Sequence, residues 1–431
     1  MQKLHSTDSN FTQAFAGFIR AREDEAADVA EIVKPILATV RERGDSVLFS
    51  YTEQFDGLSL NAATLRVDAA RIKQAYEECD AAVVESLQHA AARIQSYHEK
   101  QLPKDERYTD EAGVTLGWQW KPVDAVGLYV PGGRASYPSS VLMNAIPAKI
   151  AGCRRLVMTV PTPKGEMNPA VLVAADIAGV DEIYTVGGAQ AVAALAYGTE
   201  SIAPVDKIVG PGNAYVAEAK RQVFGTVGID TIAGPSEILV VADNTQNPDW
   251  IAADILSQAE HDPSSQSVFI TNDAVFADAV EAAVEATLKT LPREAIARAA
   301  WEQNGAMIIV QDWAEAWPLV NQLATEHLEL CMENAEEYLG EIRHAGAIFL
   351  GKYTCEALGD YVAGPSHVLP TSRAARFSSG LGVLDFMKRT SLIGVSQQGY
   401  QQIAESGATL ADCEGLGAHA LSIRIRGERE E

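Results

Sequence analysis

The sequence predicts an α/β protein with parallel-type sheets, arranged in more than one domain. The chain has 431 residues, which is ample to bury more than one hydrophobic core. Hydrophobic residues make up 47% of it and charged residues 21%, which is typical of globular proteins. Between residues 129 and 241, predicted strands alternate with glycine-rich loops and helices. Such alternation is typical of βαβ units around a parallel sheet.

The charge and the cysteines restrict the classes of partner and compartment. A formal net charge of −24 would repel phosphate backbones and anionic lipid headgroups, so we expect neither a nucleic-acid nor a membrane partner. No stretch approaches the roughly 20 apolar residues that span a bilayer, and no signal peptide is visible. The five cysteines are widely spaced and form no C-x-x-C pair, which favours a reducing compartment. We therefore expect a cytoplasmic protein.

The first hundred residues are predicted to be mostly helical. Apolar residues recur at helical spacing over residues 27–40, and Gly44 follows as a stop signal. Two further helices are predicted over residues 68–78 and 80–97, with Asp68 and Asp80 as N-caps. Strands begin only at residues 114–131, where apolar residues alternate and then form a continuous run.

Two α/β stretches follow. In the first, strands at 156–160, 182–186 and 207–209 are each followed by a helix, at 170–177, 189–197 and 214–224 respectively. The second covers roughly residues 237–380, with strands near 238–241, 267–271, 307–310 and 347–350. After about residue 383 the pattern shortens to small helices and a charged tail.

Three glycine-rich turns follow predicted strands and precede predicted helices. Glycine lets the backbone approach a ligand, and free N–H groups at a helix N-terminus favour a pyrophosphate or carboxylate. The alternative is that glycine is needed only for tight turns. None of the turns spells G-x-G-x-x-G, so a bound dinucleotide would occupy an incomplete version of the nucleotide fold. The turns are Pro131-Gly132-Gly133, Gly187-Gly188-Ala189-Gln190 and Gly210-Pro211-Gly212-Asn213.

Four segments carry candidate metal and acid–base residues. Gln258 and His261 are three positions apart near the end of a predicted helix, which places both on one face. Both can bind Zn²⁺, although the helix alone could be structural. Glu326 and His327 are adjacent at what the pattern predicts as a helix end, where they could serve two proton transfers or be simply a solvated Glu and a half-buried His.

The other two segments lie nearer the C-terminus. Asp360 and His367 lie in a loop rich in turn formers, where functional groups are common. Glu414 and His419 lie beside two glycines. Taken singly, none of the four segments identifies a site.

As a set and in order, eight segments of the chain resemble histidinol dehydrogenase. The resemblance covers nearly the whole sequence. It implies an NAD-linked, four-electron oxidation of L-histidinol to L-histidinal and then to L-histidine, the last two steps of histidine biosynthesis. The segments are GLYVPGGRASYPSSVLMNAIPAKIAG, VGGAQAVAALAYGT, KIVGPGNAYVAEAKR, AGPSEILV, LSQAEHDP, EHLEL, AGPSHVLPTSRAARFSSGLGVLDFMKR and EGLGAHA.

The resemblance also implies roles for particular residues. His327 would take the alcohol proton in each oxidation, and Glu326 would activate water to hydrate the aldehyde. Zinc ligands would be Gln258, His261, Asp360 and, from the partner subunit, His419. Contacts with NAD would come from Tyr129, Gln190 and Asn213. Substrate contacts would come from Ser236, His367 and Glu414, together with His327 and the four zinc ligands.

A domain arrangement follows in part from the same resemblance. It comprises an N-terminal arm (1–25), a split α/β domain with the zinc and acid–base residues (26–128 and 237–382), an inserted NAD-binding domain (129–236) and a C-terminal dimer-exchange tail (383–431). Both α/β domains would be incomplete Rossmann-like folds. The arm and the tail would reach across to the partner of an obligate homodimer.

Three other functions compete with this one. A paralogous zinc- and NAD-dependent dehydrogenase would act on a different small polar alcohol, because the metal site constrains the reaction more than the substrate. A non-catalytic metal-binding or nucleotide-sensing protein would be expected to lack Glu326, His327 or a zinc ligand, and all are present. A zinc hydrolase lacks support because H-E-x-x-H is absent. A cysteine nucleophile is not expected, since none of the eight segments contains a cysteine and Cys413 lies only beside Glu414.

Overall fold

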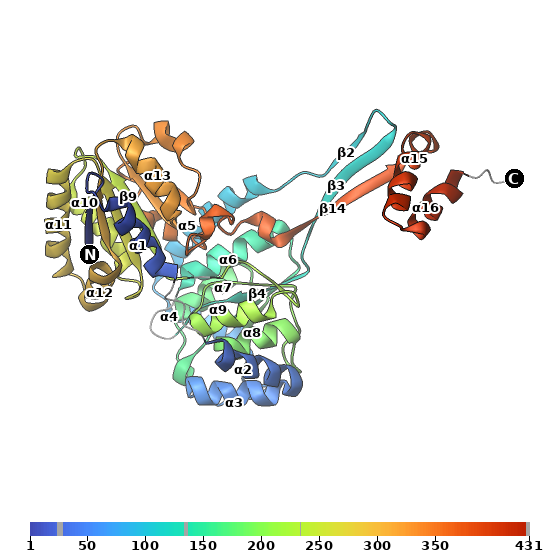
Figure 1. The fold of residues 1–431 in the computed structure, drawn as a ribbon. Coiled ribbons are helices and arrows are strands. Elements are labelled where there is room, and N and C mark those ends of the chain that lie inside the picture. Colours follow the sequence, from blue (N-terminus) through green and yellow to red (C-terminus); the bar gives the residue numbers. More distant parts are fainter. Residues whose placement is uncertain (24–28, 133–136, 233, 428–431) are drawn as a thin grey trace.

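Three sheets organise the computed structural model, which describes residues 1–23, 29–132, 137–232 and 234–427. Two of the sheets are parallel, and each forms the centre of a domain (Figure 1). The third sheet is antiparallel and extends away from both domains (Figure 1). Gly133 of the first glycine turn lies outside the described residues. The prediction of an α/β protein with parallel sheets is confirmed.

The first parallel sheet has five strands in the order β6-β5-β4-β7-β8. Alternate residues of the central strands point to opposite faces, and both faces are buried, which explains the nearly continuous apolar runs. The predicted strands and helices of this stretch are confirmed. The elements are β4 (Ala125–Tyr129), α6 (Pro138–Ala151), β5 (Arg155–Thr159), α7 (Pro169–Ile177), β6 (Glu182–Tyr184), α8 (Gly188–Tyr197), β7 (Lys207–Val209), α9 (Ala214–Val223) and β8 (Gly228–Ile229).

Helices from the first hundred residues complete both faces of this sheet. One core combines residues of α4 (Ala69–Glu78) and α5 (Ala81–His98) with α6 and α7. The other combines α2 (Ala30–Arg43) and α3 (Asp45–Asp56) with α8 and α9. Asp68 and Asp80 cap α4 and α5 as predicted. These helices therefore do not belong with residues 237–382, and this corrects the expected split domain: the five-stranded sheet needs apolar cover on both faces, and they supply it.

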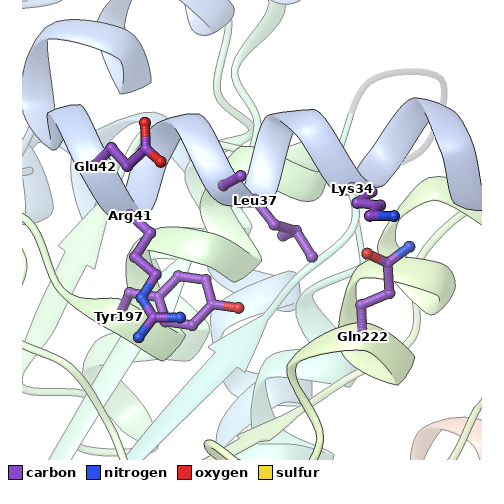
Figure 2. Close-up of a pocket in the computed structure, with 7 residues that line it drawn as sticks. Lys34, Leu37, Arg41, Glu42, Tyr197 and Gln222 are labelled. Atoms are coloured by element: carbon purple, nitrogen blue, oxygen red, sulfur yellow. The ribbon is translucent and has the colours of Figure 1, made fainter.

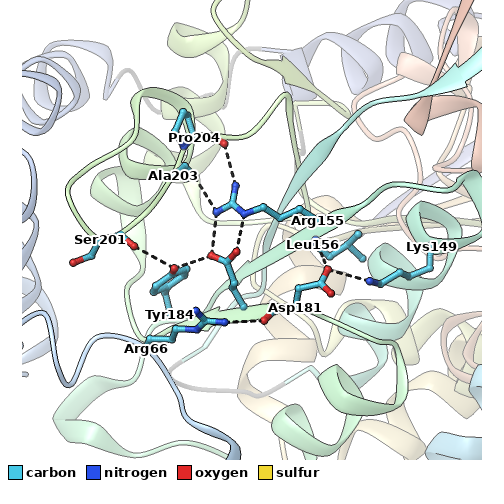
Figure 3. Close-up of polar contacts among 10 residues, drawn as sticks. Arg66, Lys149, Arg155, Leu156, Asp181, Tyr184, Ser201, Ala203 and Pro204 are labelled. Atoms are coloured by element: carbon cyan, nitrogen blue, oxygen red, sulfur yellow. Dashed lines mark hydrogen bonds and ion pairs between the residues drawn. The ribbon is translucent and has the colours of Figure 1, made fainter.

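Two close-ups show how this domain is held together. In Figure 2, Arg41 of α2 lies over the ring of Tyr197 in α8, beside a surface cavity of about 460 Å³. In Figure 3, Arg155 on β5 forms two hydrogen bonds, of 2.7 and 3.0 Å, with the carboxylate of Glu182 on the neighbouring strand β6. The same guanidinium donates to the carbonyl oxygens of Ala203 and Pro204. Bidentate pairs of this kind fix geometry as well as contribute energy.

The second parallel sheet has six strands in the order β1-β11-β10-β9-β12-β13. Separate apolar cores cover its two faces. The four strands predicted near residues 238, 267, 307 and 347 are confirmed. The elements are β1 (Gln2–His5), α1 (Phe11–Glu23), β9 (Glu237–Ala242), α10 (Pro248–Ala259), β10 (Gln266–Thr271), α11 (Ala274–Leu288), α12 (Glu294–Asn304), β11 (Ala306–Ile309), α13 (Trp313–Leu323), β12 (His327–Cys331), β13 (Ala347–Leu350) and α14 (Glu356–Tyr361).

The N-terminal residues differ from the expected arm. Strand β1 pairs in parallel with β11 at the edge of the six-stranded sheet. Phe15 and Phe18 of α1 are buried in one of that sheet's cores. In this chain the described residues 1–23 are therefore an integral part of the second domain, because their apolar side chains complete its core.

Both parallel sheets have the same strand order around their centre. From β4, the strands β5 and β6 follow on one side and β7 and β8 on the other. From β9, the strands β10 and β11 follow on one side and β12 and β13 on the other. The order of the strands therefore reverses at one point in each sheet, between the adjacent strands β4 and β7 and between the adjacent strands β9 and β12. In open parallel sheets, ligands bind at such switch points.

The antiparallel sheet forms a long arm. It consists of β2 (Glu106–Thr109), β3 (Val114–Pro122) and β14 (Met387–Val395), with β3 in the middle. Two helices, α15 (Gln397–Cys413) and α16 (Gly417–Arg424), lie at its far end (Figure 1). The small C-terminal helices were predicted, but the strand β14 that carries them was not. Among the described residues, no helix is both long and apolar enough to cross a membrane.

Candidate active site

Seven of the expected site residues meet at the amino-terminal ends of β9 and β12. His327 is the first residue of β12 and is paired in register with Ile238 of β9. In the six-stranded sheet, the candidate site therefore lies at the end opposite the carboxyl ends of the strands. The residues that gather here are Ser236, Gln258, His261, Glu326, His327, Asp360 and His367, and Glu356, which was not predicted, joins them.

A sharp turn places Glu326 and His327. The prediction of a helix end at these residues is wrong by a few positions: α13 ends at Leu323, and Ala324 adopts a left-handed conformation with φ 49°. The strand then begins at His327, because Leu328 and Leu330 alternate into the core behind the sheet. Both Glu326 and His327 are buried.

The two nitrogens of the His327 imidazole differ in their hydrogen bonding. Its Nδ1 lies 2.9 Å from the backbone oxygen of Glu237. A carbonyl oxygen only accepts, so Nδ1 must carry the hydrogen of this bond. Its Nε2 is buried and has no hydrogen-bond partner among the described residues. This Nε2 faces Glu356 Oε1 at 3.8 Å and Asp360 Oδ1 at 3.7 Å.

Glu237 contacts both Glu326 and His327, the two candidate acid–base residues. Its backbone N–H donates to Glu326 Oε2 at 3.0 Å, while its carbonyl oxygen accepts from His327. Glu326 Oε2 lies 3.7 Å from His327 Nδ1. The carboxylate of Glu237 accepts from the backbone N–H of Ser372 at 3.0 Å. Glu237 was not predicted as a site residue, although a glutamate at the head of an apolar strand is an unusual residue to bury.

The carboxyl groups of the site are buried, which disfavours their ionised forms. Burial raises the pKa of Glu326 to about 8 and that of Glu356 to about 7. Burial lowers the pKa of His327, but the charges of Glu326, Glu356 and Asp360 outweigh it and raise this pKa well above its usual value. In metal-free protein, Glu326 and Glu356 therefore favour their protonated forms, and a bound cation would take the place of these protons.

The donor atoms fit a metal ion. Single ligand atoms of His261, Glu356 and Asp360 all lie within 4.8 Å of one another. The amide oxygen of Gln258 is buried and accepts no hydrogen bond from the part of the chain that the structure describes. An orphaned buried acceptor calls for an explanation, and a cation supplies one. Glu356 was not predicted; its signal was a position one helical turn before Asp360.

His367 connects the two domains at this site. Its Nδ1 donates to the backbone oxygen of Asp360 at 2.9 Å. Its Nε2 lies 3.1 Å from the hydroxyl of Ser140, near the start of α6 in the five-stranded domain. Ser236 lies directly before Glu237, in the segment leading into β9. The candidate site is therefore bordered by both domains.

Tyr129, Gln190 and Asn213 lie around the switch point of the other sheet. Tyr129 ends β4, and its hydroxyl accepts from the backbone N–H of Gly188 at 3.1 Å. Gln190 is buried in the first turn of α8, and Asn213 caps α9 through two hydrogen bonds. Gly210 has φ +112°, and a Cβ there would lie 2.1 Å from Tyr129 O. The predicted glycine turns after β6 and β7 thus converge on Tyr129.

Glu414 and His419 are not part of this cluster. Both are exposed and lie at the end of the arm, around the junction of α15 and α16. Figure 1 shows these helices well separated from α10 and β9. Within one chain, the site therefore contains three of the four expected zinc ligands.

Comparison with known proteins gives one consistent result. A family model described as histidinol dehydrogenase matches residues 19–427. The chain is 58% identical to histidinol dehydrogenase of Rhodospirillum rubrum over 428 residues, covering 99% of both chains. It is 58% identical to histidinol dehydrogenase 1 of a Nostoc species over 426 residues, covering 99% and 98%. A crystal structure of histidinol dehydrogenase from Elizabethkingia anophelis matches with a TM-score of 0.94 at 36% identity, covering 99% and 98%.

Proposed function

Because the chain belongs to the histidinol dehydrogenase family and is thus an oxidoreductase, we propose that it oxidises L-histidinol to L-histidine through L-histidinal. The reaction would use two NAD molecules and one zinc ion. The observation that carries this proposal is that His327 Nε2, which makes no hydrogen bond to the described residues, lies close to a set of potential metal-ligand atoms. This group of atoms is bordered by the domain that carries the glycine turns.

Gln258, His261 and Asp360 would hold the zinc ion, with His419 of the partner subunit as the fourth ligand. When bound, zinc would orient the imidazole and amine of the substrate, and NAD would accept the hydride. The orphaned oxygen of Gln258 and the excess of buried carboxylates support a cation here. Glu356 lies within reach of the same ion.

His327 would act as the base in both oxidations. In the neutral form of the ring, the bond from Nδ1 to the Glu237 carbonyl fixes the tautomer in which Nε2 presents a lone pair. Nε2 can therefore accept the proton of the alcohol and later that of the hydrated aldehyde. Glu326 would take a proton from the water that adds to the aldehyde. Ser236, His367 and the partner's Glu414 would contact the substrate.

NAD would bind at the carboxyl ends of β4 and β7. Backbone N–H groups after β6 and β7 and the start of α8 and α9 provide donors for a pyrophosphate. Tyr129, Gln190 and Asn213 border this region. Burial raises the pKa of Tyr129 to about 12, so its hydroxyl stays protonated and available to donate.

The enzyme would function as a homodimer in the cytoplasm. His419 is exposed at the end of an arm, a position from which it could reach the site of a second copy of the chain. Apolar side chains are exposed on the helices of the same unit, which supports burial there against protein. All five cysteines are unpaired, as suits a reducing compartment.

The first experiment measures NADH formed per molecule of L-histidinol consumed by the purified protein. Two NADH per substrate are expected, with loss of activity on chelation and return on adding zinc. One NADH per substrate, or turnover only of another small polar alcohol, would instead place the chain with a paralogous dehydrogenase.

A mixed-subunit experiment tests the shared site. Inactive His419→Ala chains are combined with inactive His261→Ala chains. Hybrid dimers then contain one site with both lesions and one with neither, so part of the activity should return. Hybrids that stay inactive after verified exchange of subunits would contradict a shared site.

A further inference from the structure

Two carboxyl groups that the proposed mechanism does not use face each other behind the candidate site. Asp254 lies four residues before Gln258 in α10, and Glu329 lies two residues after His327 in β12. These spacings place each carboxyl on the same face of its element as the site residue. One carboxyl oxygen of Asp254 lies within 4.8 Å of one of Glu329. The pair therefore brings α10 and β12 together.

The pair is shielded from water. Glu329 has no exposed surface, and burial together with the charge of Asp254 raises its pKa well above its usual value. Asp254 is half-buried, and burial raises its pKa to about 6. Two carboxyl groups this close together disfavour ionisation of both.

Glu329 also anchors a third element. Its Oε1 accepts the backbone N–H of Glu356 at 2.6 Å. Glu356 is the first residue of α14, and the preceding Cys355 offers no side-chain cap. Glu329 therefore satisfies an N–H that the helix itself leaves unpaired. Ser257 of α10 adds a parallel link by donating to Glu356 Oε2 at 2.9 Å.

The remaining neighbour of the pair is Cys331. Its thiol donates to Glu329 Oε2 at 3.7 Å, and burial raises the pKa of this thiol so that it stays protonated. One ligand atom from each of Asp254, Glu329 and Cys331 lies within 4.8 Å of the others. The hydrogen bonds that Glu329 accepts from Cys331 and Glu356 hold its carboxyl group in this position without a second metal ion.

We propose that Asp254 and Glu329 are positioning residues that hold α10, β12 and α14 together so that the metal-site residues converge. The three elements carry Gln258, His327 and Asp360, and His261 follows directly on α10. The inference rests on the proposed function, because it assigns the pair to the zinc site of that function. Residues that orient metal ligands typically change metal affinity about 10- to 100-fold when they are replaced.

The test compares two variants of Glu329 in the full-length protein. In Glu329→Gln, the amide oxygen can accept from Glu356 N–H and the amide NH₂ can donate to Asp254, which reproduces the protonated acid. In Glu329→Leu, the hydrogen bonds that Glu329 accepts from Cys331 and Glu356 are lost at similar volume. Zinc affinity is measured by competition with a chromophoric chelator, and the melting temperature is measured on metal-free protein.

Zinc affinity is expected to stay within about threefold in Glu329→Gln and to fall at least about tenfold in Glu329→Leu. A matched control is Thr271→Val, which removes a buried hydroxyl at the carboxyl end of β10, a strand that β9 separates from β12. It should lower the melting temperature and leave zinc affinity unchanged. Asp254→Ala is a milder second variant should Glu329→Leu not fold, with an expected loss of several-fold.

Three results would overturn the inference. Equal damage in Glu329→Gln and Glu329→Leu would mean that Glu329 acts as a charged group. Unchanged zinc affinity in Glu329→Leu and Asp254→Ala would remove the positioning role. Loss of affinity in Thr271→Val equal to that in Glu329→Leu would make the effect one of general stability. If the wild-type protein binds zinc and does not oxidise L-histidinol, the proposed substrate is wrong. The zinc affinities of the variants then still test the positioning role of Asp254 and Glu329.

Discussion

The burial of Glu326 makes the stability of the folded protein depend on pH. Its pKa in the folded protein, about 8, is raised by burial from an ordinary 4.5. A carboxyl with a raised pKa favours the folded state below its unfolded pKa, and this contribution is lost as the pH rises through the folded pKa. In metal-free protein, ionising Glu326 should therefore destabilise the fold progressively between about pH 4.5 and 8.

The variant Glu326→Gln isolates this effect, because glutamine resembles the protonated acid at every pH. Relative to wild type, metal-free Glu326→Gln should gain stability from pH 5 to pH 8, by at most about 5 kcal/mol. Urea unfolding of both proteins across this range measures the difference. The sign would be wrong if the variant lost stability relative to wild type as the pH rose.

At the scale of elements, the loop between β7 and α9 depends on a glycine. Gly210 has a positive φ, and a Cβ would overlap Tyr129 O at 2.1 Å, so any side chain would push the β7 loop away from β4. Gly210→Ala should therefore raise the KM for NAD by about tenfold, with a smaller effect on kcat. Steady-state kinetics with NAD as the varied substrate measure this change.

Gly225 provides the matched control for Gly210. It also has a positive φ, of +100°, but no atom lies within 4 Å of a Cβ placed there. Gly225→Ala should cost about 1–2 kcal/mol of backbone strain and leave the KM for NAD unchanged. A rise in KM shared by both variants would show that strain, and not the contact with Tyr129, controls NAD binding.

The elements also show what a sequence can and cannot predict. The strands at 207–209 and 347–350 and the caps Asp68 and Asp80 were predicted correctly, because local periodicity and local hydrogen bonds determine them. Strand β14 was missed because its side chains are mostly exposed and only its pairing with β3 defines it. Glu356 and Glu237 were missed as site residues because their importance depends on contacts across the fold.

At the scale of the whole molecule, Glu414 and His419 lie apart from the other site residues, around the junction of α15 and α16. The arm that ends in these helices extends away from both parallel-sheet domains (Figure 1). Several of its large apolar side chains are exposed, among them Leu410 at 65% and Leu421 at 61%. Since burying one leucine contributes about 1.5–3 kcal/mol, covering these residues in a symmetric dimer would contribute twice over.

Leu421→Glu should therefore break the dimer and, with it, the activity. Placing a charge in a buried interface should weaken association by on the order of 100-fold or more. Because the site would then lack His419 of the partner subunit, activity at low protein concentration should disappear and return in part as the concentration rises. Val275→Glu is the control, since Val275 is 79% exposed but lies on α11, outside the arm. Sedimentation velocity and activity at matched concentrations distinguish the outcomes: a Leu421→Glu protein that stays active as a monomer would show that each chain completes its own site.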